Sequence, residues 1–350
     1  MEKDNIPMLE LLLRPAFCVK DGKIVKINSS AAPFLLSEGT EILPLIQTGA
    51  EEYGAFQDGR LYLTLSIGGT VTDATVMVMD GMHLFILEPT PGKSELQALA
   101  LAALELRLPL AGMMLSADNM CSNTPPEQAA QFNRRLYQML RTVSNMSDAI
   151  SFCESSPATE YVEICGLLEE ILEKTVVLLQ EMHISLHYEL PNEAIVTVAD
   201  QEKLERAVYN LLSNAIKHTP AGGSIHVRLQ RKGRLYLSVT DGGQGISEAA
   251  KANVYTRYLR APSLNDGQEG LGLGMVLIKA TAQLHGGTVL IDHPADGGTR
   301  GTMTMALRHQ KTATIRTPSL RIDYAGERDH ALQELADVLP ESLYRPDNLR

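Results

Sequence analysis

One segment near the middle of the chain decides its fold, and it runs Asn210-Leu-Leu-Ser-Asn214-Ala-Ile-Lys217-His218-Thr-Pro220. The apolar residues of this segment recur at helical spacing, which predicts an amphipathic helix. Asn210, Asn214 and Lys217 lie together on another face of that helix. A carboxamide oxygen is a hard ligand that suits Mg²⁺, and an ammonium group can neutralise a phosphate oxygen. The segment therefore predicts either a magnesium and phosphate site or the polar surface of an ordinary helix.

Residues 235–240 alternate between apolar and polar side chains, which predicts a strand that leads into Asp241. Gly243 and Gly245 follow, and glycines let a backbone turn sharply and come close to a flat ring. The Asp241 carboxylate can accept a hydrogen bond from an exocyclic amine at the same place. This pattern predicts one wall of a nucleotide-base pocket, although a strand followed by a glycine-rich turn is also a common structural feature.

A further glycine-rich segment, Gly270-Leu-Gly272-Leu-Gly274, precedes an apolar helical run over residues 275–282. Glycines let backbone N–H groups approach phosphates, and the start of a helix adds the positive end of its dipole. The dinucleotide-binding fold requires a strand directly before the glycines, whereas a polar loop over residues 263–269 stands there. We therefore reject the dinucleotide interpretation and retain that of a phosphate-binding loop.

In this order, and with residues 254–260 between them, these segments resemble the N, G1, F and G2 boxes of the ATP-binding domain of sensor histidine kinases, a branch of the GHKL ATPases. Residues 298–302 match the last glycine motif of that family. The resemblance implies that Asn214 binds Mg²⁺, that Lys217 contacts a phosphate of ATP and that Asp241 binds the adenine amine. The complete ATP site that it implies consists of Asn210, Asn214, Lys217, His218, Asp241, Gly243, Gly245, Tyr258, Gly270, Gly272, Gly274 and Thr302, with Asn214 as the metal ligand.

Composition narrows the class of protein. The 350 residues suffice for two or three domains, and 44% of them are hydrophobic. A net charge of −11 argues against binding to a nucleic-acid backbone. The four cysteines show no CxxC spacing, so we expect no disulfide framework and a reducing cytoplasm. The longest apolar run, residues 96–104, is too short for a membrane span, and residues 1–5 show no signal-peptide pattern.

Four parts are expected along the chain, which gives an α+β multidomain fold class. Residues 1–90 predict short strands between turn signals and resemble a PAS-like sensor domain of α+β type. Residues 94–155 predict a two-helix dimerisation hairpin, which forms a four-helix bundle in the dimer. Residues 160–310 predict the GHKL α/β sandwich, with a helix over residues 161–182 and helices on one face of a mixed sheet. Residues 311–350 form a C-terminal tail.

The helical pair resembles the dimerisation and phosphotransfer hairpin of histidine kinases, most clearly at Glu105-Leu-Arg-Leu-Pro109-Leu. In that family a histidine before this segment accepts the phosphoryl group, and in this chain the position is Leu104. No histidine occurs in residues 94–157, and a leucine has no lone pair that could attack a phosphate. Glu105 occupies the place of the acid that assists the histidine, so it either keeps a weak catalytic role or is a solvated helix residue.

The sequence therefore predicts a soluble, cytoplasmic protein of two-component signal transduction that resembles a sensor histidine kinase and binds ATP and Mg²⁺. Autophosphorylation at the usual place is not expected, because the acceptor is Leu104. Two alternatives stay open, namely a catalytically silent ATP-dependent regulatory module and a kinase that phosphorylates another protein in trans. We expect a homodimer through residues 94–155, a response regulator or a partner kinase as a further partner, and no nucleic acid. Asn210 stands where ATP-hydrolysing GHKL members have a glutamate, so fast hydrolysis is not expected either.

Overall fold

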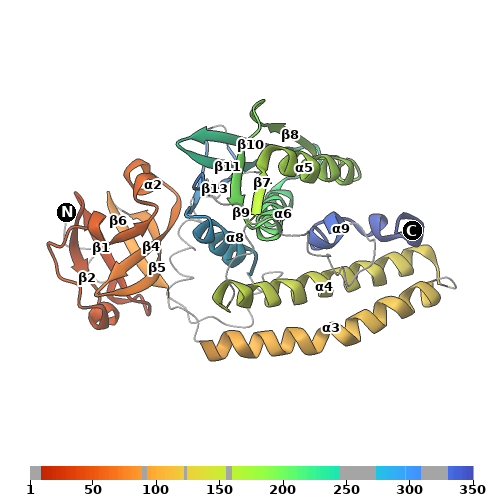
Figure 1. The fold of residues 1–350 in the computed structure, drawn as a ribbon, viewed down its shortest axis with the longest axis horizontal. Coiled ribbons are helices and arrows are strands. Elements are labelled where there is room, and N and C mark those ends of the chain that lie inside the picture. The colour runs from red at the N-terminus through yellow and green to blue at the C-terminus, as the bar shows by residue number, and fades with distance from the viewer. Residues whose placement is uncertain are drawn as a thin grey trace.

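A single large sheet extends across the molecule, and a long helical pair runs along one side of it (Figure 1). The structure is a computed structural model that describes residues 9–79, 81–88, 93–121, 124–154, 160–243, 273–295, 297–308 and 330–349. The sheet has eleven strands in the order β2-β1-β6-β5-β4-β12-β13-β11-β10-β8, and β3 pairs with β4 beside this path. The predicted combination of α and β structure is therefore present, but eleven of the described strands form one continuous sheet that joins two of the expected parts.

The N-terminal part of the sheet is antiparallel throughout. Asp21 and Gly22 adopt positive φ angles at the predicted turn between β1 and β2. The Asn28 side chain caps the short 3-10 helix η1 by accepting a hydrogen bond from the backbone N–H of Ala31. The elements of this part are β1 (Ala16–Lys20), β2 (Lys23–Ile27), η1 (Ser29–Phe34), η2 (Leu43–Leu45), β3 (Ile46–Thr48), α2 (Ala50–Ala55), β4 (Arg60–Ile67), β5 (Thr70–Met79) and β6 (Met82–Glu88).

The second part of the sheet is mixed, because β8 and β10 are parallel while the other neighbours are antiparallel. Three helices cover one of its faces, as the sequence predicts for an α/β sandwich (Figure 1). Buried side chains from these helices and from the sheet form the largest hydrophobic core of the chain. The elements are α5 (Ile164–Gln180), β8 (Ser185–Glu189), α6 (Gln201–His218), β10 (Ser224–Lys232), β11 (Arg234–Asp241), α8 (Leu273–Leu284), β12 (Val289–Asp292) and β13 (Arg300–Met305).

The predicted helix over residues 161–182 begins later than expected, so that boundary is wrong. Residues Glu160–Glu163 form strand β7, which pairs antiparallel with β9 (Val196–Ala199) in a separate small sheet. Helix α5 begins only at Ile164, because the Glu163 carboxylate caps it and accepts a hydrogen bond from the backbone N–H of Cys165 at 3.0 Å. Over so few residues, strand and helix periodicity cannot be distinguished.

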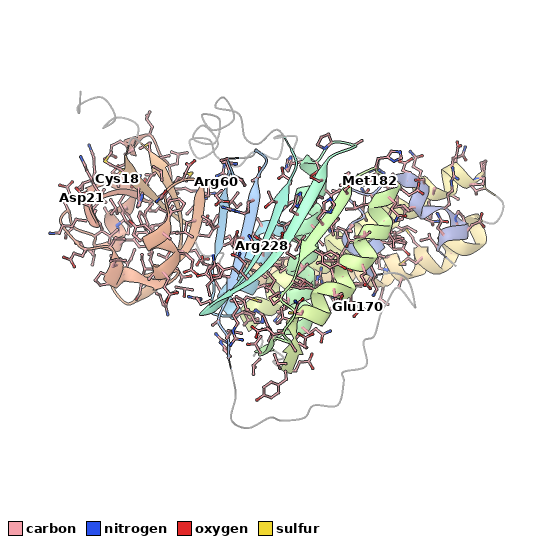
Figure 2. All side chains as sticks on the ribbon, turned by 90° about the horizontal axis from the view of Figure 1, so that it is seen from above. Cys18, Asp21, Arg60, Glu170, Met182 and Arg228 are labelled. Atoms are coloured by element: carbon pink, nitrogen blue, oxygen red, sulfur yellow. The ribbon has the colours of Figure 1, made fainter. Side chains whose placement is uncertain are left out.

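The two parts of the sheet join where β4 pairs antiparallel with β12. Arg60 lies opposite Ile291, and Leu61 lies opposite Leu290. Figure 2 shows Arg60 at this junction and Arg228 further along the same sheet. The sequence predicts neither this pairing nor any other contact between the N-terminal module and the second part of the chain.

Side chains on α8 reinforce the junction from the helical face. The Lys279 ammonium forms an ion pair with Glu88 at 2.6 Å and lies 4.5 Å from the centroid of the Tyr62 ring. The Gln283 amide donates to the Asp73 carboxylate at 2.8 Å. Burial alone would raise the pKa of Glu88, but the Lys279 charge and the hydrogen bonds from Lys279 and Thr75 together outweigh burial and hold that pKa below its usual value. Helix α8, which begins at Leu273, therefore contacts the N-terminal module.

Gly59→Ala tests whether this junction holds in solution. Gly59 has a φ of +90°, and a Cβ atom there would overlap the carbonyl oxygen of Ile291. Because left-handed backbone costs a non-glycine residue about 1–2 kcal/mol and the overlap adds to it, we expect the amides of β12 to lose at least about tenfold of their hydrogen-exchange protection. Gly68→Ala is the matched control, because Gly68 also has a positive φ but nothing lies within 4 Å of its added Cβ. Equal losses of protection in both variants would contradict the junction.

Helices α3 (Lys93–Cys121) and α4 (Pro126–Glu154) form the predicted antiparallel pair (Figure 1). Residues such as Ala103, Leu110, Leu136 and Val143 are buried along this pair. Other apolar side chains of α3 are exposed, with 38–82% of their surface open, namely Leu101, Leu104, Leu106, Leu108 and Met113. In the part of the chain that the structure describes, no helix combines the length and apolar character needed to cross a membrane.

Residues 330–349, here called the C-terminal segment, lie between α4 and the helices of the second part (Figure 1). The segment consists of α9 (His330–Glu334), η3 (Glu341–Tyr344) and η4 (Pro346–Asn348). Leu335, Leu339 and Tyr344 are fully buried within the largest core. Tyr344 also forms an edge contact with Tyr137 of α4, with ring centroids 5.3 Å apart. The expected tail is thus in part an integral layer of the fold.

Candidate functional site

The segment that decides the fold forms helix α6, as predicted. The Asp200 side chain caps its start by accepting a hydrogen bond from the backbone N–H of Lys203 at 3.2 Å. The helix ends at His218, because Thr219 is extended and Pro220 follows. The apolar face packs into the core and consists of Leu204, Ala207, Val208, Leu211, Leu212, Ala215 and Ile216.

The predicted ligands on the polar face of α6 differ in how far their side chains are buried. Asn214, Lys217 and His218 are exposed on its last turn, which leaves their side chains open to a ligand. Asn210 lies one turn earlier, and only 2% of its surface is exposed. Its Nδ2 group donates to the backbone carbonyl of Arg206 at 2.9 Å. Asn210 is therefore part of the packed interior, whereas Asn214 can reach a metal ion or phosphate from solution.

Asp241 is the last residue of β11, and its carboxylate organises the turn beside it. Oδ1 accepts hydrogen bonds from the backbone N–H of Gly243 at 2.9 Å and from that of Thr299 at 3.1 Å. Asp241 is 6% exposed. A Cβ at Gly298, which has a φ of +77°, would overlap the carbonyl oxygen of Asp241. The carboxylate thus ties together two glycine-containing turns that are more than fifty residues apart in sequence.

Glycines from separate motifs approach α6 so closely that a side chain would not fit. A Cβ at Gly243 would lie 2.5 Å from the carbonyl oxygen of His218. A Cβ at Gly274 would lie 2.7 Å from Oδ1 of Asn210. The last turns of α6, the end of β11 and the start of α8 therefore meet at one place, as the order of the motifs predicts.

The remaining predicted ATP-site residues differ in what the structure describes of them. Gly245, Tyr258, Gly270 and Gly272 lie outside the described residues. Thr302 is buried in β13 opposite Ser238 of β11. Its neighbour Gly301 faces Leu211 of α6, so strand alternation puts Thr302 on the other face of the sheet.

At the position where the family resemblance predicts a phosphoacceptor, Leu104 is 58% exposed on α3. Glu105 is exposed next to it. The surface of α3 at this point therefore presents an apolar side chain and an adjacent carboxylate, and neither is enclosed by the rest of the described chain.

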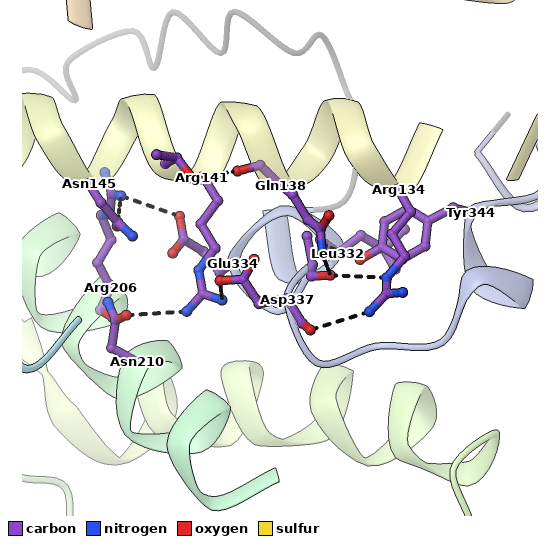
Figure 3. A network of polar contacts seen from close by, with 12 residues as sticks. Arg134, Gln138, Arg141, Asn145, Arg206, Asn210, Leu332, Glu334, Asp337 and Tyr344 are labelled. Atoms are coloured by element: carbon purple, nitrogen blue, oxygen red, sulfur yellow. Dashed lines mark hydrogen bonds and ion pairs between the residues drawn. The ribbon is translucent and has the colours of Figure 1, made fainter. Parts of the chain in front are cut away.

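A buried polar network that the sequence did not predict connects α6 to α4 and to the C-terminal segment (Figure 3). Arg206 of α6 forms an ion pair with Asp148, donates to Asn145 at 2.9 Å and lies 3.7 Å from Glu334. Burial raises the pKa of Asp148 to about 6, even though the Arg206 charge acts in the opposite direction. Breaking this buried ion-pair network costs free energy, because each charged group would lose its partners while it stays shielded from water.

Arg141 of α4 belongs to the same network. Its guanidinium donates to Asp337 of the C-terminal segment at 2.7 Å and to Oδ1 of Asn210 at 3.2 Å. Sequence reasoning missed Arg141 because its partners lie 196 and 69 residues away along the chain. No local signal marks Arg141, because it stands outside the apolar stripe of α4, to which Leu136 and Val143 belong.

Comparisons with known proteins agree with the motifs. A crystal structure described as "ShkA full-length in complex with AMPPNP" is similar, with a TM-score of 0.48 and 22% identity over 62% of this chain and 47% of that chain. The adaptive-response sensory kinase SasA of Synechococcus sp. (strain JA-3-3Ab) is 26% identical over 208 residues, which are 56% of this chain and 55% of the relative. The alginate biosynthesis sensor protein KinB of Pseudomonas aeruginosa is 26% identical over 70% of this chain and 42% of the relative.

The chain spans about half the length of these two curated relatives. Residues 199–310 match the family model described as "Histidine kinase-, DNA gyrase B-, and HSP90-like ATPase". This range includes α6, Asp241 and the start of α8, where the glycines meet. Residues 199–310 are therefore an ATPase domain of the histidine kinase-, DNA gyrase B- and HSP90-like type, and the chain is similar to sensor histidine kinases.

Proposed function

We propose that this chain is a signalling protein that binds Mg-ATP and passes the nucleotide state to its helical hairpin without autophosphorylation at the usual place. The observation that carries the proposal is the convergence of Asp241, Gly243 and Gly274 on α6 beside the exposed Asn214 and Lys217. Asn214 would hold Mg²⁺ between the phosphates, and Lys217 would neutralise a phosphate oxygen. Gly245, Tyr258, Gly270, Gly272 and His218 complete the proposed site.

The adenine would be recognised by Asp241. Oδ1 already accepts two backbone hydrogen bonds, so Oδ2 is the oxygen that would accept from the exocyclic amine. Thr302 remains a member of the proposed site only through its family motif. Because an amide replaces the glutamate of hydrolysing relatives at Asn210, the nucleotide would be held rather than turned over.

The proposed parts of the chain keep the boundaries that the motifs give them. They are a PAS-like sensor domain over residues 1–90, a degenerate dimerisation and phosphotransfer hairpin over residues 94–155, the ATP-binding domain over residues 160–310, and a tail over residues 311–350. The exposed apolar side chains of α3 support pairing with a second copy into a four-helix bundle. We further propose a cytoplasmic location and a response regulator or partner kinase as the recipient of the signal.

Incubation with γ-labelled ATP separates this function from autophosphorylation at another histidine and from phosphorylation of another protein in trans. We expect no label on the purified chain, because Leu104 offers no nucleophile and Glu105 has no imidazole to assist. Acid-labile label on the chain would instead indicate autophosphorylation at another histidine. Label that appears only on an added histidine kinase or response regulator would favour a kinase that acts in trans.

A further inference from the structure

We propose that Arg141 of α4 is a positioning residue for the nucleotide site: it fixes the Asn210 carboxamide beneath Gly274, and Asp337 of the C-terminal segment holds Arg141 in place. The inference deepens the proposed function and rests on it. It assigns to the hairpin helix and to the C-terminal segment, which ends 39 residues beyond the ATPase-type match at residue 310, a direct part in building the site.

Asn210 is held at both ends of its carboxamide. Nδ2 donates to the Arg206 carbonyl at 2.9 Å, and Oδ1 accepts from the Arg141 guanidinium at 3.2 Å. Since the residue is 2% exposed, water does not compete for these bonds. The amide plane is therefore fixed, and the bond from Arg141 also settles which end of the amide is the oxygen.

The fixed oxygen lies against the start of α8. A Cβ at Gly274 would approach Oδ1 of Asn210 to 2.7 Å, so a glycine at this position leaves room for the Asn210 side chain. At the start of a helix, the backbone N–H groups of the first turn are the ones that approach a phosphate. The position of that turn sets the direction in which these groups point. A change in the Asn210 side chain would thus shift the first turn of α8, and with it the N–H groups proposed to approach a phosphate.

Arg141 is suited to this role by the shape of its side chain. Its side chain is 5% exposed, and its planar guanidinium reaches Asp337 with Nη1 and Asn210 with Nη2 at the same time. A lysine presents one compact ammonium and does not reproduce such a two-armed contact. Without Arg141, Oδ1 of Asn210 would be left buried with no donor among the residues that the structure describes.

The C-terminal segment supplies a fixed position for Asp337 (Figure 3). Arg134 of α4 donates to the backbone carbonyls of Ala336 and Asp337, both at 3.3 Å. Gln138 also donates to the Ala336 carbonyl, at 3.3 Å, and Asn133 donates to the Tyr344 carbonyl at 3.1 Å. These bonds set the register of the segment along α4, and the register places the Asp337 carboxylate at Arg141.

The connection has a consequence for signalling. Hydrogen bonds lead from the C-terminal segment through Arg141 of α4 to Asn210, whose oxygen lies in close contact with Gly274 at the start of α8. A displacement of α4 that breaks the bond from Arg141 to Asn210 would weaken nucleotide binding. By linkage, bound nucleotide would favour the position of α4 in which that bond is made.

Titration calorimetry of the full chain with ATP in excess Mg²⁺ tests the inference with three variants. Arg141→Met removes the guanidinium at similar volume, and we expect about tenfold weaker binding. Arg141→Lys keeps the charge without the fork, and we expect it to restore less than half of the lost binding free energy. Arg135→Met is the matched control, because Arg135 is exposed on the same helix and contacts Gln138. We expect this control to bind as the unaltered chain does.

A double-mutant cycle separates positioning from general destabilisation. In a chain that carries Asn210→Leu, the further change Arg141→Met is expected to have less than about a twofold effect, because no buried oxygen then needs a donor. An undiminished tenfold effect in that background would overturn the positioning role. If Arg141→Met fails to fold, Asp337→Ala decides, since Asp337 is half-exposed. We expect about fivefold weaker binding for Asp337→Ala, and unchanged affinity would overturn the inference.

Two experimental outcomes distinguish a failure of this inference from a failure of the proposed function. If the unaltered chain binds Mg-ATP and Arg141→Met binds it equally well with normal thermal unfolding, the inference is wrong and the function stands. If the unaltered chain does not bind Mg-ATP at all, the proposed function is wrong and the inference fails with it.

Discussion

Asp241→Asn is expected to lower the affinity of the chain for Mg-ATP about 100-fold, which corresponds to roughly 3 kcal/mol. The amide oxygen of the replacement can still accept hydrogen bonds from the backbone N–H groups of Gly243 and Thr299, so the turn keeps its shape. The NH₂ group of the replacement would face the exocyclic amine of adenine with a second donor, and the charge-assisted hydrogen bond would be lost. Titration calorimetry measures the difference.

Purine riboside triphosphate, which lacks the exocyclic amine, is the matched ligand for this experiment. The unaltered chain should bind it about as weakly as the Asp241→Asn variant binds ATP. The substitution should then change the affinity for the analogue by less than about threefold, because the group that Asp241 recognises is absent. Equal affinities of the two proteins for ATP would show that Asp241 is not the adenine ligand.

Leu104→His is expected to give the chain an acid-labile phosphoryl group that the unaltered chain lacks. Phosphoryl transfer depends mainly on positioning and on neutralisation of charge, so a nucleophile is the missing part. An imidazole at this position would be accessible, because Leu104 is 58% exposed, and the Glu105 carboxylate is next to it to assist proton removal. Incubation with γ-labelled ATP, followed by separate acid and base treatment, measures the result.

Leu106→His is the matched control for that variant. Leu106 is 43% exposed on the same helix, but two residues correspond to about 200° of rotation, so its side chain points to another side. We expect label on Leu104→His and none on Leu106→His. Label on neither variant would mean that more than the acceptor has been lost, and equal label on both would mean that the position of Leu104 is not special.

Much of the fold follows from local patterns in the sequence. The apolar stripe of residues 201–218 and its following proline suffice to predict α6, and the alternation over residues 235–240 predicts β11 to within one residue at each end. The junction between β4 and β12 has no such signal. Residues 60–67 alternate in the same way whether the strand ends a sheet or pairs with a partner more than two hundred residues later.

In the candidate site too, local sequence patterns predict some features, while others depend on contacts between distant parts of the chain. Asn214, Lys217 and Asp241 are predictable because their motifs carry both local structure and chemistry. The burial of Asn210 is not predictable from its motif, because it depends on Arg141 and on a C-terminal segment whose contacts lie far away in sequence. A helical pattern indicates which residues share a face, but it does not indicate what packs against that face.

The most direct test of the central claim is a calorimetric titration of the unaltered chain with ATP, first in excess Mg²⁺ and then with a chelator. We predict saturable binding at one site per chain that weakens strongly when Mg²⁺ is removed, together with a higher midpoint of thermal unfolding in the presence of ATP. The absence of any heat of binding and of any shift in unfolding at saturating Mg-ATP would contradict a nucleotide site on α6.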